Sequence, residues 1–253
     1  MAHLLSKGVY HCARGLVRLF YRRPRFEGLE NLPDGPCVIV GNHAQMHGPI
    51  IAELYIPGDR VVWCNSEMMT LAQVPDYAFQ DFWSDKPVSV RWLFRLLSYA
   101  IAPLSVCIFN NAKCVPVYHD ARIMTTFRET VKRLSDGQRI VIFPESDPPR
   151  NEIIYELHDR FIDLGYMFHR QTGKALAFVP MYIAPALKSV VFGEPLFYDA
   201  AARPAEERER LREGLIDAIT RLALSLPRHR VVPYRNMPKT RYPMSQPEEE
   251  ATK

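Results

Sequence analysis

Apolar and polar positions divide the chain into two kinds of segment. Short apolar runs rich in β-branched residues recur along it, which is typical of strands buried in a sheet. The predicted strands are 37–40, 60–65, 114–118, 139–144, 177–183 and 189–195. Helical periodicity separates most of them and predicts helices over 121–135, from Ile153 to Thr172, and from Pro204 onward. This alternation predicts an α/β fold with a mostly parallel sheet covered by helices on both faces.

The first 26 residues carry a different pattern. Apolar residues recur there at helical spacing, and six lysines and arginines precede the first acidic residue, Glu27. The apolar positions are Leu4, Leu5, Val9, Cys12, Leu16, Leu19 and Phe20. Residues 1–26 are therefore predicted to form a basic amphipathic helix. Such a helix either lies on an anionic membrane surface or packs on the domain with its arginines in solvent.

Residues 27–233 are predicted to form one α/β domain, and residues 234–253, rich in Pro and Glu, a flexible C-terminal tail. A chain of 253 residues with 47% apolar content is long enough to bury a sizeable core. The five cysteines form no CxxC pair, which argues against a disulfide framework or a zinc knuckle. Arginines interrupt the first 25 residues, so we expect no secretory signal and a location inside the cell.

The longest segment without charge is Leu96–Ala112. Its apolar part, which ends at Phe109, would be only about 21 Å long as a helix, and Pro103 interrupts it, whereas a bilayer core needs about 30 Å. We therefore predict no transmembrane span. The segment either rests on a membrane surface or forms a buried helix pair hinged near Pro103.

Two polar clusters follow predicted strands. GNHAQMHGPI follows CVIV, and FPESDPPRNE follows RIVI. The carboxyl ends of parallel strands lie at one edge of a sheet, so we expect the clusters to share that edge. His43 is the side chain best suited to move a proton near neutral pH, although a single histidine after a strand is also compatible with a structural role.

Four blocks of the sequence resemble a known family in order and spacing. They are VGNHAQMHGP, NNAKCVPVYHD, LSDGQRIVIFPESD and AFVPMYI, and together they cover residues 25 to 200 approximately. The chain resembles the glycerolipid or lysophospholipid acyltransferases related to 1-acylglycerol-3-phosphate acyltransferase. The resemblance implies an α/β domain that is peripheral or monotopic at the cytoplasmic face of a membrane.

The chemistry that the resemblance implies is direct acyl transfer. An acyl group would pass from acyl-CoA or acyl-carrier protein to a hydroxyl of a lysophospholipid or related glycerolipid. His43 would be the general base, with no metal or other cofactor. Glu145 is the expected supporting residue, and Asp147 and His47 are the alternative partners for the imidazole. Backbone N–H groups at the start of the helix after His43 would stabilise the oxyanion.

The sequence departs from the family pattern at several positions. The family motif NHxxxxD has an aspartate that orients the histidine, and Gly48 occupies that position here. His119 replaces the arginine that ends the second block, and FPESDPPR replaces FPEGTRS in the third. The expected substrate-binding residues are Asn42, His47, His119, Arg122, Pro144, Ser146, Asp147 and Arg150. Arg122 and Arg150 are the candidates for binding a headgroup.

Two other interpretations remain open. Because Gly48 breaks the motif, the chain could be a catalytically weak or inactive membrane-surface protein that binds lipid with the same fold. The HxxxH spacing of His43 and His47 also fits part of a metal site. No second histidine box follows, so we expect no bound metal.

Overall fold

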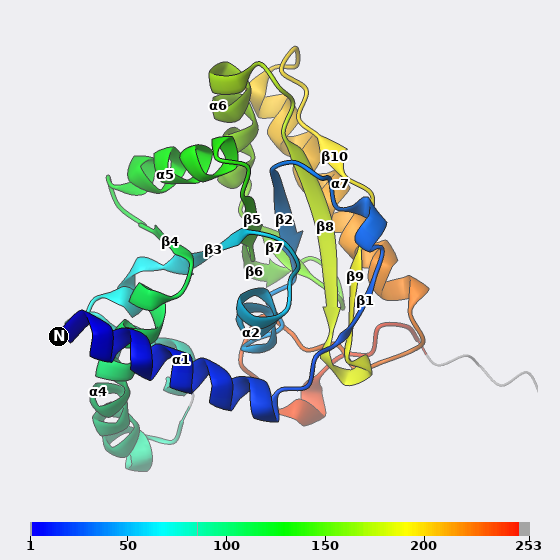
Figure 1. Cartoon of the computed structure of the whole chain (residues 1–253). Coiled ribbons are helices and arrows are strands. Elements are labelled where there is room, and N and C mark those ends of the chain that lie inside the picture. The colour runs from blue at the N-terminus through cyan, green and yellow to red at the C-terminus, as the bar shows by residue number, and fades with distance from the viewer. Residues whose placement is uncertain (1, 85, 248–253) are drawn as a thin grey trace, which may run out of the picture. The chain divides into compact units, whose positions relative to one another are not determined.

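The computed structural model describes residues 2–84 and 86–247, with side chains from residue 6 onward. The side chains of Leu4 and Leu5 and the tail beyond residue 247 thus lie outside the described residues. The chain divides into two compact units (Figure 1). The small unit contains residues 1–22 and 61–129, and the large unit contains residues 23–60 and 130–253. The predicted α/β class with a mostly parallel sheet is confirmed.

The large unit is built on a mixed sheet. Its strands lie in the order β1 (Arg25–Glu27), β9 (Ser189–Phe192), β8 (Ala177–Ala184), β2 (Cys37–Gly41) and β5 (Arg139–Ile142). β2 pairs in parallel with both β5 and β8, and β1 pairs in parallel with β9. β9 and the short β10 (Leu196–Phe197) pair antiparallel with β8. The strands predicted at 37–40, 139–144, 177–183 and 189–195 are thus all present.

The core of the large unit surrounds β2 and β8. Every residue of both strands is buried, which explains why the sequence shows continuous apolar runs there rather than alternation. α7 (Pro204–Ser225) begins at its proline as predicted and packs along β8 (Figure 1). Its buried stripe includes Leu211, Leu215 and Ile219.

The small unit contains two long helices. α1 (Ala2–Phe20) packs against α4 (Val88–Asn111), and α3 (Val74–Trp83) packs on α4 around a small cluster of Val74, Ala78 and Ala102. β3 (Arg60–Asn65) and β4 (Cys114–Val117) pair in parallel, as their apolar runs predicted. The amphipathic helix ends at Phe20, six residues earlier than predicted.

α4 differs from the sequence prediction. It is one continuous helix of 24 residues through Pro103, so the alternative of two helices hinged at that proline is wrong. We predicted no transmembrane span from the length of residues 96–109 alone. The helix also includes the turns from Val88 to Arg95, so it is longer than that stretch. Among the described residues, this one helix is long and apolar enough to cross a membrane by length and composition.

The segment after Phe143 also differs. We predicted a helix from Ile153 to Thr172, but its first part forms β7 (Tyr155–Leu157) and a short 3-10 helix (Arg160–Ile162), and β7 pairs in a hairpin with the preceding β6 (Glu145–Pro149). α6 begins only at Asp163 and ends at Thr172, before Gly173 in the left-handed conformation. The apolar residues of 153–161 are buried by the hairpin and the following short helix, so their spacing did not distinguish the two structures. Two further α-helices are α2 (His47–Leu54) and α5 (Ile123–Ser135).

Candidate active site

The first and third sequence blocks meet at the carboxyl ends of β2 and β5. These strands are parallel neighbours, with Val40 opposite Ile142, so the residues that follow them emerge at the same edge of the sheet. The backbone N–H of His43 donates a hydrogen bond to Oε2 of Glu145, at 2.5 Å. Two clusters that lie 102 residues apart in the sequence therefore form one site in the large unit.

The Glu145 carboxyl group is hydrogen-bonded to backbone N–H groups and not to the His43 imidazole. Its second oxygen, Oε1, accepts a hydrogen bond from the backbone N–H of Tyr155 at 3.0 Å, so the carboxyl group joins the His43 turn to β7. The residue is only 5% exposed. Burial raises the pKa of the Glu145 carboxyl to about 7, against the opposing effect of the two backbone hydrogen bonds.

The turn after His43 has an unusual backbone. Ala44 and Gln45 both lie in the left-handed region, with φ of 46° and 54°, although neither is glycine. Each such residue costs about 1–2 kcal/mol relative to a right-handed conformation, and the surrounding contacts must compensate. Ala44 is fully buried, and Glu145 fixes the residue before it.

Gly48 leaves no room for the family aspartate. Its backbone N–H donates to the carbonyl oxygen of His43 at 3.0 Å, which brings the two residues into close contact. A Cβ at position 48 would lie 2.4 Å from that oxygen and 3.0 Å from the ring of Phe143. The loop therefore requires glycine because of this close approach, and no larger residue fits without a shift of the backbone.

Two aromatic rings contact the His43 imidazole. Phe143 and Tyr234 both meet it edge to face, with ring centroids 5.5 and 5.9 Å away and interplanar angles of 66° and 74°. Its Nδ1 is buried and has no hydrogen-bond partner among the described residues. Burial lowers the pKa of the His43 imidazole, and the backbone of Gln45 partly opposes that shift.

The start of α2 offers fewer free donors than expected. The backbone N–H of His47 donates to Ala44 and that of Gly48 to His43, while Pro49 has no N–H. These groups stabilise the turn itself, so they are not available to an oxyanion in this conformation. Burial and the nearby charge of Lys239 both lower the pKa of His47.

Asn42 has a structural environment. It is 1% exposed, and its side chain continues the pairing of β2 with β8 beyond Gly41. Nδ2 donates to the carbonyl of Ile183 at 3.1 Å, and Oδ1 accepts from the N–H of the same residue at 2.7 Å. Both ends of the amide are therefore occupied by backbone, and sequence reasoning had assigned Asn42 to the substrate.

The other residues of the third block have diverse partners. The Pro144 carbonyl accepts from the N–H of His158, and Ser146 Oγ donates to the Glu156 carbonyl at 3.4 Å. Asp147 Oδ2 accepts two hydrogen bonds from Arg235, at 2.8 and 2.5 Å. Arg235 belongs to the predicted flexible tail, and sequence reasoning gave no signal for this pair.

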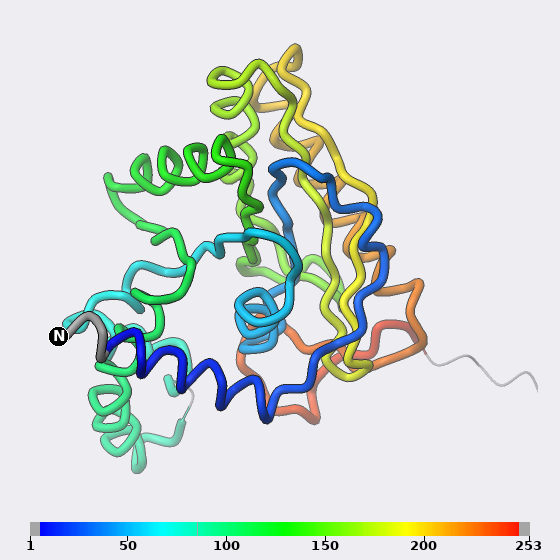
Figure 2. The backbone as a smooth tube through the Cα atoms, viewed as in Figure 1, coloured from blue at the N-terminus to red at the C-terminus, as the bar shows by residue number. Residues whose placement is uncertain are grey.

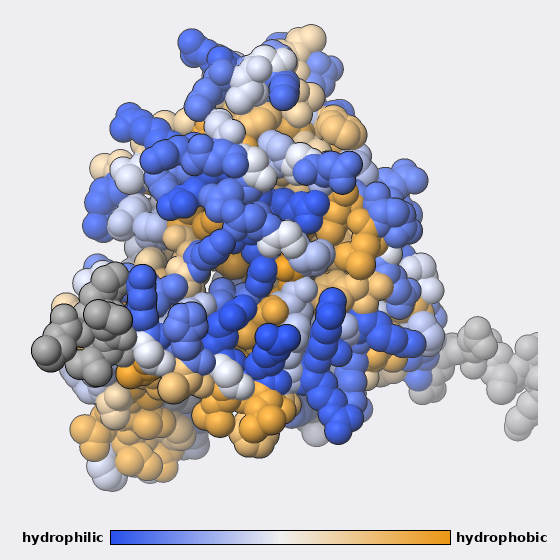
Figure 3. Space-filling view, viewed as in Figure 1, coloured by the Kyte–Doolittle hydropathy of each residue, from blue (hydrophilic) through white to orange (hydrophobic). Residues whose placement is uncertain are grey.

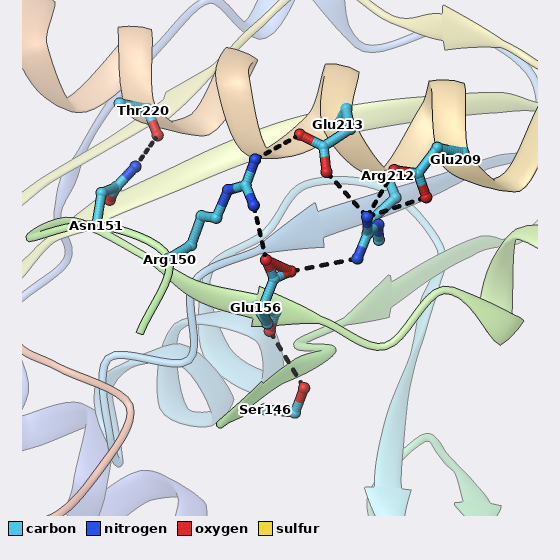
Figure 4. Close-up of polar contacts among 8 residues, drawn as sticks. All are labelled: Ser146, Arg150, Asn151, Glu156, Glu209, Arg212, Glu213 and Thr220. Carbon is cyan, nitrogen blue, oxygen red and sulfur yellow. Dashed lines mark hydrogen bonds and ion pairs between the residues drawn. The ribbon is translucent and has the colours of Figure 1, made fainter. Parts of the chain in front are cut away.

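Arg150 is directed toward α7. It forms ion pairs with Glu156 at 3.3 Å and Glu213 at 2.9 Å (Figure 4). Arg212 joins the same network through Glu156 at 3.4 Å and Glu213 at 3.0 Å. The guanidinium that we expected to bind a headgroup thus stabilises the contact between the β6–β7 hairpin and α7.

His119 and Arg122 belong to the small unit. His119 is exposed, and Arg122 binds both oxygens of Asp120 while its guanidinium lies 4.3 Å from the ring centre of Tyr118. The hydrogen bonds from Arg122 lower the pKa of the Asp120 carboxyl to about 2. Any anion that binds Arg122 must compete with this carboxylate.

Comparisons with known proteins found similarity to solved structures only. No family model and no curated protein matches the chain. Among solved structures, the chain is similar to the crystal structure of the 1-acyl-sn-glycerophosphate acyltransferase PlsC from Thermotoga maritima. The match has a TM-score of 0.45 and 18% sequence identity, and it covers 87% of this chain and 79% of that chain.

A metal site was the other possibility raised by His43 and His47. Among the described residues there is no group of three or more His, Cys, Asp or Glu side chains that could hold a metal ion.

The close approach at Gly48 can be tested by unfolding. We expect Gly48→Ala to lower the free energy of unfolding by about 1–3 kcal/mol, because the new methyl group meets the His43 carbonyl. Gly48→Asp should lower the free energy of unfolding at least as much, so it should not restore an aspartate that orients His43. Gly35→Ala is the control, since nothing lies within 4 Å of its added Cβ. Equal stability of Gly48→Ala and wild type in urea would contradict the assignment.

Glu145 should make stability depend on pH. Its pKa is about 7 in the folded chain against 4.5 for the ordinary side chain, so between these values the folded state binds more protons. This contribution favours folding below about pH 4.5 and is lost as the pH rises toward 7, by up to about 3 kcal/mol. Glu145→Gln removes the titration. The difference in unfolding free energy between wild type and this variant should therefore change across that range. A flat difference for Glu145→Gln would disprove the burial effect.

Proposed function

We propose that the chain transfers a fatty acyl group from an acyl thioester to a hydroxyl of a lysophospholipid or related glycerolipid, with His43 as the general base. The observation that carries the proposal is the 2.5 Å hydrogen bond from the His43 backbone to buried Glu145. It joins the NH and FPE blocks, which are the two parts of the sequence that most closely resemble the acyltransferase family.

The path of the proton in the reaction follows from the protonation state of the His43 imidazole. Burial lowers the pKa of the imidazole, which keeps it neutral near pH 7 and able to accept a proton. As the acceptor oxygen bonds to the thioester carbonyl carbon, its proton passes to His43. The tetrahedral intermediate then expels the thiolate, which takes the proton back from the imidazolium and leaves as a free thiol.

Glu145 supports this chemistry through the backbone. It contacts the main chain of His43 and Tyr155, so it fixes the backbone position of His43. It takes no proton from the substrate. The headgroup-binding residue is not Arg150 in this arrangement, because Glu156 and Glu213 hold that side chain at α7. The acceptor class is therefore proposed as a glycerolipid alcohol, with no assignment of its headgroup.

The proposed place of action is a membrane surface. On α1 and α4, the side chains that face away from the packing are largely apolar, and Figure 3 shows hydrophobic residues gathered over α4. Leu19, Phe20 and Trp92 are 75%, 79% and 68% exposed. Basic residues of α1, including Lys7 and Arg18, are exposed as well, which suits anionic headgroups.

A second function has two observations in its favour. His43 Nδ1 has no partner among the described residues, and Gly48 excludes the carboxylate that would bind it in the family motif. A site of this kind could bind lipid without turnover.

The activity test separates the two functions. Purified full-length chain is incubated with mixed acyl-CoA and several lysolipids, and the lipid products are measured by mass spectrometry. We expect transfer by wild type and at least about a hundredfold loss in His43→Ala, because the base is removed while the fold remains. His43→Gln, with a similar volume, is the matched control for packing and should lose activity equally. Lipid binding without any acylated product from wild type would favour the second function, and normal transfer by both variants would exclude His43 as the base.

The membrane proposal has a separate test. The double variant Leu19→Glu, Phe20→Glu should reduce cosedimentation with anionic phospholipid vesicles by at least about tenfold, because two inserted apolar side chains are lost. Leu224→Glu, at an exposed leucine of α7, is the control and should bind as wild type does. Unchanged sedimentation of the double variant would exclude this face of α1 from membrane binding.

A further inference from the structure

The segment after α7 folds into a closed loop, which we call the C-terminal loop (residues 229–245). The N–H of Val231 donates to the carbonyl of Pro243 and that of Ser245 to the carbonyl of His229, both at 2.9 Å. Arg230 and Met244 form a β-bridge between these two hydrogen bonds. The two ends of the loop are therefore tied together, although the sequence predicted a flexible tail from residue 234.

A buried polar network anchors the ends of this loop to β8. The hydroxyl of Tyr182 lies 2.9 Å from Nε2 of His229, and the Nδ1 of His229 lies 2.8 Å from the carbonyl of Pro227. A carbonyl only accepts, so Nδ1 carries the hydrogen and Nε2 accepts from Tyr182. Tyr182, His229 and Ser245 are all buried. The base of the loop is thus part of the core of the large unit.

The far end of the C-terminal loop lies against the His43 turn. Figure 2 shows this orange-to-red segment returning beside the start of α2. The carbonyl of Arg235 accepts from Gln45 Nε2 at 3.2 Å, and the hydroxyl of Tyr242 donates to Gln45 Oε1 at 3.0 Å. Arg235 also forms its ion pair with Asp147. Two of these contacts hold the loop at the turn that carries His43, and the ion pair holds it at β6.

These contacts place Tyr234 against the imidazole. The Tyr234 ring meets His43 edge to face at 5.9 Å and packs on Tyr155 at 5.6 Å. Phe143 contacts the imidazole as a second aromatic neighbour. Gly48 leaves no space for a carboxylate, and Nδ1 has no partner within hydrogen-bond distance among the described residues. The ring is therefore oriented mainly by packing, with a weaker interaction with the Gln45 backbone, and not by a charged hydrogen bond.

We propose that Tyr234, which lies on the C-terminal loop, is a positioning residue for His43. Its ring orients the imidazole, which is the role of the aspartate in the family motif. An edge-to-face contact fixes the plane of a ring without adding charge, and it excludes water from one side. The catalytic consequence rests on the proposed function, but the orientation of the ring does not.

The charged and titratable groups around this contact are few. Glu145, from β6, binds the backbone N–H of His43, and Asp147 and Arg235 neutralise one another. His47 lies on α2 and Tyr155 on β7. Burial is the main cause of the lowered pKa of His43, so removal of the Tyr234 ring should admit water and raise that pKa toward its usual value.

The test measures the His43 ring directly. In full-length chain labelled with ¹⁵N-histidine, NMR titration gives the pKa and tautomer of His43, assigned with His43→Gln. We expect Tyr234→Leu to raise the pKa by about half a unit or more and to mix the two tautomers. Tyr234→Phe keeps the ring and should titrate as wild type does. Tyr166→Leu, at an exposed tyrosine of α6, is the control and should also change nothing.

Activity gives the second measurement. Tyr234→Leu should lower kcat by about tenfold or more with KM within about threefold, and Tyr234→Phe should restore kcat. A folded Tyr234→Leu with the wild-type pKa and tautomer of His43 would overturn the proposal. If this variant does not fold, Arg235→Gln loosens the loop while it keeps the tyrosine, and the absence of any change in His43 titration there would overturn the proposal equally.

The two proposals fail in different ways. If wild type transfers no acyl group but Tyr234→Leu shifts the titration of His43, the proposed function fails and the positioning role stands. If wild type is active and the titration is unchanged in folded Tyr234→Leu, the function stands and the positioning role fails.

Discussion

The candidate site depends on one buried carboxyl group that is bonded to backbone. Burial of a carboxylate is unfavourable unless hydrogen bonds replace its water, and Glu145 finds two backbone N–H donors, from His43 and Tyr155. These bonds tie the end of β2 to the β6–β7 hairpin. They also fix the residue that precedes two left-handed positions, Ala44 and Gln45, so an otherwise unfavourable turn is held in one conformation.

A packed aromatic environment has consequences that differ from those of a carboxylate. A carboxylate beside a histidine stabilises the imidazolium and selects one tautomer, whereas Phe143 and Tyr234 fix the plane of the ring and add no charge. His43 should therefore be a weaker base that stays neutral to lower pH. The loop that supplies Tyr234 comes from the far end of the chain, so the site and the last described segment form one structural unit.

The fold was predictable where the apolar pattern is unambiguous. The continuous apolar runs of β2, β5 and β8 identify buried parallel strands, and their order places the NH and FPE blocks at one sheet edge, where His43 and Glu145 are indeed bonded. The pattern from Ile153 to Phe168 was ambiguous, because a hairpin and a short helix bury the same residues as one long helix would.

The partners of polar side chains were much less predictable. The side chain of Asn42 is hydrogen-bonded to the backbone of Ile183, which lies 141 positions later, and Arg150 forms an ion pair with Glu213 on α7. Tyr234 and Arg235 lie in a segment whose composition suggests a solvated tail. Such pairings depend on tertiary distances that periodicity does not encode, and Gly48 is informative only once the carbonyl of His43 is known to lie beside it.

The backbone amide of His43 offers the most direct measurement of the interaction on which this site depends. Its proton, bound to a buried carboxyl, should exchange slowly with solvent, and its NMR chemical shift should follow an ionisation near pH 7, the value given by burial of Glu145. An amide that exchanges at the rate of an unstructured loop, with a shift that does not respond to this ionisation, would contradict the account.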